Sequence, residues 1–127
     1  MCSYYFDDTD AGPPGTQPAS YPAACGSGWT CEHRWSSIMN MVQFANVAVG
    51  EPVTNWQAGN YWLGFGRGSK AFVAMGDLNK EFNTGLPDGE YCDIIHDCET
   101  KVTISGGRGY FSPAHENDPV VAICVGC

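Results

Sequence analysis

The sequence predicts a mainly β fold, a sandwich or barrel of short strands preceded by one α-helix. Three observations support this prediction. Residues 31–49 are the one convincing stretch with apolar residues at helical intervals, residues 53–125 hold a series of short strand-like runs, and 16 Gly and 8 Pro supply many turns. At 127 residues the chain is long enough for one domain with a modest core.

Residues 1–24 predict a loop, because they are rich in Asp, Gly, Pro, Ser and Thr and show no period of 2 or 3.6. Residues 4–6 are β-prone but too few to form a stable strand without a neighbour. Residues 8–12 begin like a calcium loop, yet the closing Glu is missing and Pro13 and Pro14 interrupt it. We therefore expect a solvated acidic loop there rather than a metal site.

Cys25 and Cys31 are separated by five residues that include two glycines, which suits a local disulfide. Cys31, Glu32 and His33 could instead be a fragment of a metal cluster. No second pair with zinc-like spacing follows, so the disulfide is the favoured interpretation.

Residues 35–49 predict an amphipathic helix that ends at Gly50-Glu51-Pro52. Its apolar positions and its polar positions fall on opposite faces. The apolar face holds Trp35, Ile38, Met39, Val42 and Ala45, and the polar face holds Ser36, Ser37, Asn40 and Gln43. The apolar face must be covered either by the β part of the chain or by another body.

The chain after Pro52 alternates short apolar runs with Gly, Pro, Asn and Asp turns, the pattern of a sandwich or barrel. We predict strands at Val53 to Gln57, Tyr61 to Gly66, Lys70 to Gly76, Phe82-Asn83, Tyr91 to Ile95, Lys101 to Ile104, Gly109 to Phe111, and Val120 to Val125.

Cys92 and Cys98 repeat the five-residue spacing of the first pair and predict a second local disulfide. His96 lies between them and is interpreted as a surface-loop histidine, since no partner of matching spacing is evident. Cys124 and Cys127 form a C-x-x-C that follows a strand, which favours a third disulfide or a pairing with Cys2 over redox catalysis.

The formal charge of −8 and the pI near 4.5 argue against nucleic acid and anionic membranes as partners. No apolar run is long enough to span a membrane. Seven cysteines favour an oxidising compartment, and their odd number leaves one thiol over. Secretion conflicts with the absence of a leader after Met1, unless Met1 is internal to a longer parent.

Several segments resemble the C-terminal part of animal-type α-amylases, in the order of that family and over roughly residues 1–124. They are CGSGWTCEHRWSSIMNMVQFANV, Asn55-Trp56, FGRGSKAFVAM, TGLPDGEYCDII and DPVVAI. The resemblance implies the last helix of a (β/α)₈ barrel within residues 1–49 and a C-terminal Greek-key β-sandwich over residues 50–127. It also implies the disulfides Cys25–Cys31 and Cys92–Cys98. The missing barrel would cover the helix face of Trp35, Ile38, Met39 and Val42.

Members of this family hydrolyse internal α-1,4 bonds of starch and glycogen with two carboxyl groups. The motifs that carry those groups, and the family's calcium and chloride ligands, lie upstream and do not occur in this chain. The resemblance therefore implies no catalytic residue, no metal site and no cofactor here, and the chain alone is predicted to be inactive. Cys2, Cys124 and Cys127 depart from the family pattern and allow an extra disulfide or a cross-link between chains.

Two other functions compete with that of a non-catalytic amylase C-terminal region. The first is a free-standing secreted module for carbohydrate binding or extracellular matrix assembly, in which Trp56, Tyr61 and Trp62 stack on α-glucan rings. Strand alternation places Trp62 on the face opposite Tyr61, so some of these rings must belong to the core. The second is a redox or metal protein that uses the surplus cysteines.

Overall fold

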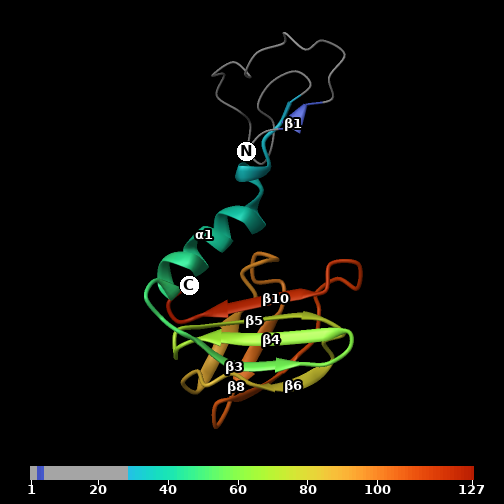
Figure 1. Ribbon diagram of the computed structural model, residues 1–127. Helices are drawn as coiled ribbons and strands as arrows, with labels where there is room; N and C mark the ends of the chain where they lie inside the picture. Colours follow the sequence, from blue (N-terminus) through green and yellow to red (C-terminus); the bar gives the residue numbers. More distant parts are fainter. Residues whose placement is uncertain (1–2, 5–28) are drawn as a thin grey trace.

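The computed structural model describes residues 3–4 and 29–127 of the chain (Figure 1). Helices and strands follow in this order: β1 Ser3–Tyr4, β2 Trp29–Thr30, the 3₁₀ helix η1 Glu32–Arg34, α1 Ser36–Ala48, β3 Val53–Ala58, β4 Trp62–Arg67, β5 Ala71–Gly76, β6 Lys80–Asn83, β7 Gly89–Cys92, β8 Lys101–Ile104, β9 Arg108–Phe111 and β10 Val120–Cys124. The mainly β class with one α-helix is confirmed.

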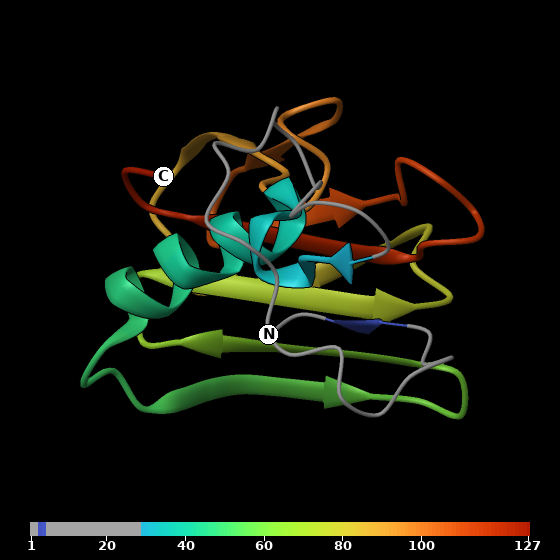
Figure 2. The ribbon, with the colours of Figure 1, turned by 90° about the horizontal axis from the view of Figure 1, so that it is seen from above.

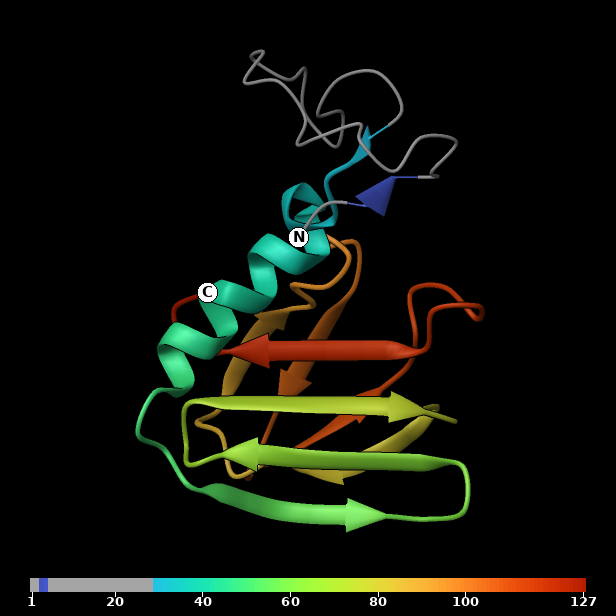
Figure 3. The ribbon, with the colours of Figure 1, turned by 45° about the horizontal axis from the view of Figure 1, so that its top comes forward.

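The β part is a two-layer Greek-key sandwich. One layer is an antiparallel sheet in the order β10-β5-β4-β3, and the facing layer contains the antiparallel pairs β6-β9 and β7-β8 (Figure 3). Strand β10 follows four strands of the second layer, yet it returns to pair with β5 in the first. The same strand also contacts β7, so β10, β7, β8 and β9 lie side by side in the 4-1-2-3 order of a Greek key.

The eight predicted strands all form, with small shifts at their ends. The exception in length is the predicted strand from Tyr91 to Ile95, because β7 ends at Cys92. The chain turns there: the Asp93 amide bonds the Thr100 carbonyl at 3.0 Å, and Cys92 and Cys98 are joined by a disulfide. Strand β2 at Trp29–Thr30, which pairs with β1, is not predicted from the sequence. Two residues are too few to show an alternating pattern.

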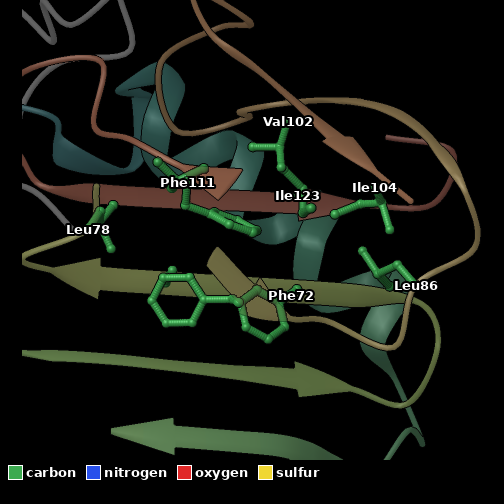
Figure 4. Packing of buried hydrophobic residues seen from close by; sticks show 10 residues of the cluster. Phe72, Leu78, Leu86, Val102, Ile104, Phe111 and Ile123 are labelled. Atoms are coloured by element: carbon green, nitrogen blue, oxygen red, sulfur yellow. The ribbon is translucent and has the colours of Figure 1, made fainter. Parts of the chain in front are cut away.

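The main core lies between the two layers (Figure 4). Three fully buried rings occupy its centre, with centroids of Phe72, Phe82 and Phe111 separated by 5.4 to 5.8 Å. Gly64 allows this packing, because a Cβ atom there would lie 2.8 Å from the Phe82 ring. The other buried members are Ala74, Leu78, Leu86, Val102, Ile104, Val121 and Ile123.

A bulge in β3 helps to join the two layers. The register of β3 against β4 shifts between Thr54 and Gln57, and Asn55 has a φ of 50°. The Gln57 side chain then donates to the Asn83 carbonyl at 2.8 Å and accepts from the Asn83 amide at 3.1 Å. The side chain thus replaces a backbone partner for the end of β6.

Helix α1 packs on β10 and β5, and seen from above it lies over these strands (Figure 2). A second buried cluster fills this junction, with Ala48 of the helix against Ala71, Ile94, Ile95, Ala122 and Cys124. Arg67 ties down the end of the helix, donating to the carbonyls of Ala48 at 3.3 Å and Glu51 at 2.9 Å. A cation at a helix C-terminus is favourable for the helix dipole.

Candidate functional site

The helix face of Trp35, Ile38, Met39 and Val42 is left exposed by the sandwich. Val42 is 58% exposed and Trp35 is 44% exposed. The sandwich instead contacts the side of α1 that carries Phe44, Val47 and Ala48. The helix is therefore apolar on two sides. Among the residues described, the sandwich covers the side of Phe44, Val47 and Ala48 and leaves the other side exposed.

Asn40 is one of the polar residues of the helix, yet it contacts the loop of residues 93–98 of the same chain. Its amide donates to the Ile94 carbonyl at 2.7 Å and to Asp97 Oδ1 at 2.8 Å. Ser37 likewise lies toward the sandwich, at the hollow beneath the helix. A polar residue on an amphipathic helix can face a loop of the same chain when that loop offers acceptors.

A hollow of about 440 Å³ lies between α1 and the outer face of the four-stranded sheet. Cross-strand pairing places Phe65, Val73 and Ala122 in one row across β4, β5 and β10. Met41 and Phe44 line the helix side of the hollow, and Asp118 is its one charged lining residue among those described. Met41 and Ala45, which line the hollow, lie three residues along the helix from Ile38 and Val42 of the exposed face. We call the exposed helix face and the hollow together the docking surface.

The three aromatic residues predicted to stack on sugars lie in two different environments. Trp56 is 62% exposed and stacks on Phe65 with ring centroids 5.7 Å apart, and Tyr61 is exposed at the β3-β4 turn. Trp62 packs against the main core, edge-on to Phe82, with the Lys80 ammonium 3.0 Å from its ring centroid. The rings of Trp56 and Tyr61 are thus exposed to solvent, whereas the Trp62 ring packs against the main core.

His96 is nearly buried and contacts two carboxylates, so the prediction of a surface-loop histidine is wrong. Its Nδ1 lies 2.7 Å from Asp93 Oδ2 and its Nε2 lies 2.9 Å from Asp118 Oδ2, with the side chain 9% exposed. Burial lowers the pKa of His96, but the hydrogen bonds and negative charges of Asp93 and Asp118 outweigh it, so the pKa is raised above its ordinary value. The sequence offered one signal for this contact, the Asp three residues before His96.

The family model for the α-amylase C-terminal all-β domain matches residues 54–125. The chain belongs to this family. It is 40% identical to an α-amylase of Pecten maximus over 99% of its own length, and 41% identical to that of Tribolium castaneum over 98%. It spans only 29% and 30% of those two relatives.

Two solved α-amylase structures also superimpose on this amylase domain. An α-amylase I variant from Eisenia fetida in complex with maltohexaose superimposes with a TM-score of 0.78 at 32% identity. The match covers 100% of this chain and 32% of that one. The wild-type enzyme gives a TM-score of 0.76 at 34% identity, over 98% of this chain and 31% of that one.

Two local disulfides lie within the described residues of this amylase domain. Cys92 pairs with Cys98, and Cys124 pairs with Cys127. Cys31 is disulfide-bonded. Cys2 and Cys25 lie outside the described residues, so the Cys25–Cys31 pairing stays a prediction.

Residues 3–4 and 29–127 lack two other kinds of feature. They contain no group of three or more His, Cys, Asp or Glu side chains placed to hold a metal ion. Within the same residues, no helix has the length and apolar character needed to cross a membrane.

Proposed function

We propose that this chain is the non-catalytic C-terminal region of an α-amylase and that it stabilises the catalytic barrel. The observation that supports this most is the helix face of Trp35, Ile38, Met39 and Val42, which the sandwich leaves exposed. A contiguous exposed apolar surface of this kind marks an interaction site. In the proposed parent, α1 is the last barrel helix and the barrel covers this face.

The parent's activity is proposed to be the hydrolysis of internal α-1,4 bonds in starch or glycogen. Its carboxyl groups, calcium ion and chloride ion would be held by the upstream region that makes up most of the relatives' length. The disulfides support a secreted parent. Contact of Trp56 and Tyr61 with α-glucan remains a secondary proposal, supported by the exposure of both rings.

A chimera tests this proposal. The segment of the Pecten maximus α-amylase that aligns with this chain is replaced by residues 1–127. We expect the chimera to fold and to hydrolyse starch, because the docking surface would meet a barrel of the same family, and we expect the isolated chain to show no hydrolysis. The released reducing sugar measures both.

Two outcomes would contradict the proposal. Starch hydrolysis by the purified isolated chain would show that it is not a non-catalytic region. A chimera that unfolds or aggregates, under conditions in which the isolated chain and the parent enzyme are both folded, would show that the chain does not fit an amylase barrel.

A further inference from the structure

We propose that His96 is a pH-responsive clasp: its protonated ring holds the loop of residues 113–119 against the sandwich, and its neutral ring loosens that loop. This inference goes beyond the proposed function and does not depend on it. It rests on the position of one imidazole between a buried and an exposed carboxylate.

The fixed side of the clasp is Asp93. Its side chain is fully buried, and its Oδ1 accepts from the amides of Ile95 at 3.0 Å and Ala122 at 3.2 Å. These bonds tie the carboxylate both to its own turn and to β10. The second oxygen, Oδ2, is then directed at His96 Nδ1, 2.7 Å away.

The movable side of the clasp is Asp118, whose side chain is 59% exposed. Its Oδ2 lies 2.9 Å from His96 Nε2. Its loop is also held by a contact between His115 Nε2 and Glu99 Oε2 at 2.8 Å, but both of those side chains are more than half exposed. Exposed pairs of this kind contribute little stability, so the His96 contact is the stronger of the two.

Protonation changes the number of donors on the ring. The imidazolium has two N–H donors and satisfies both carboxylates, whereas neutral imidazole has one and turns a lone pair toward the other carboxylate. We expect the buried Asp93 to retain the remaining proton donor, because it has no access to water. Asp118 can be hydrated instead, so the contact to the loop is the one that weakens.

The charged groups around the ring favour the closed state at acidic pH. Besides Asp93 and Asp118, the ring faces His115, which lies edge-on with centroids 5.2 Å apart and is itself paired with Glu99. The neighbouring Asp97 carboxylate is bonded to Asn40, and helix α1 carries no charged residue. Negative groups therefore outnumber positive ones, in keeping with the raised pKa of His96.

The sign of the effect follows from this raised pKa. The unfolded chain has the ordinary histidine value near 6.5. The clasp therefore contributes its full stability below about pH 6.5, and that stability is lost as the pH rises through the higher folded value. Asp118 also lines the hollow beneath α1, so loosening the loop alters one wall of the docking surface.

An NMR titration of the 127-residue chain between pH 5 and pH 9 tests the clasp. We expect the His96 Cε1–H signal to titrate with a midpoint above 6.5, and the amide signals of residues 113–119 to shift with the same midpoint. Asp118→Asn should lower the His96 midpoint and abolish the shift of the loop at that midpoint. Glu81→Gln, which removes the same charge from an exposed position on β6, should change neither.

Three results would overturn the proposal. The His96 midpoint could lie at or below 6.5, the loop amides could shift with a midpoint different from that of His96, or Asp118→Asn could leave the His96 midpoint where it is in the unmodified chain. Each variant is at an exposed carboxylate, so each is expected to remain folded.

Discussion

Phe111→Ala is expected to lower the free energy of unfolding of this chain by about 3–5 kcal/mol, while Tyr110→Ala changes it by less than about 1 kcal/mol. The two residues are neighbours in β9, but Phe111 is 0% exposed and Tyr110 is 61% exposed. Phe111 lies between Phe72 and Phe82, with ring centroids 5.4 Å from each. Removing it leaves a cavity at the point where the two layers meet.

Urea unfolding, followed by the fluorescence of the tryptophans, measures both variants. Tyr110→Ala is the matched control, since it removes an aromatic ring from the same strand on the other face. Equal losses for the two variants would contradict the two-layer packing, because that packing gives the adjacent side chains opposite surroundings.

The second large effect is expected for Val42→Asp in the chimera with the Pecten maximus barrel. If the barrel covers the helix face, the new carboxylate is buried without a partner, and we expect a loss of about 3–5 kcal/mol in stability. In the isolated chain Val42 is exposed, and the same substitution is expected to cost less than about 0.5 kcal/mol.

Gln43→Asp provides the control for charge and helix propensity. Gln43 is exposed and is the next residue on α1, about 100° around the helix from Val42. Gln43→Asp should leave the melting temperature of the chimera unchanged, whereas Val42→Asp should lower that temperature. Equal melting temperatures for the two chimeras would show that no body covers the Val42 side of the helix.

The sequence was most informative where local chemistry determines structure. The turn residues between short apolar runs located all eight strands of the sandwich, because tight turns require Gly, Pro, Asn or Asp. The predicted strand from Tyr91 ran too far into Ile94 and Ile95. These residues are apolar because they pack beneath α1, and burial in a turn leaves the same composition as burial in a strand.

Contacts between residues far apart in the chain could not be predicted from the sequence pattern. Asp118 meets His96 across 22 residues, and Asn40 meets Asp97 across 57, so no local spacing could reveal either pair. The exposed helix face was predicted as a surface that needs a cover, but periodicity gives only which residues share a face. Three-dimensional packing was required to show that the sandwich covers the other side of the helix.

Hydroxyl-radical footprinting of Trp35 and Met39, in the isolated chain and in the chimera, tests most directly whether a barrel covers the helix. Both side chains are exposed in the chain alone, and Tyr110, on the far layer of the sandwich, serves as the internal reference. We predict that oxidation of Trp35 and Met39 falls sharply in the chimera while that of Tyr110 does not change. Equal oxidation of Trp35 and Met39 in the two proteins would contradict the proposed role of the helix.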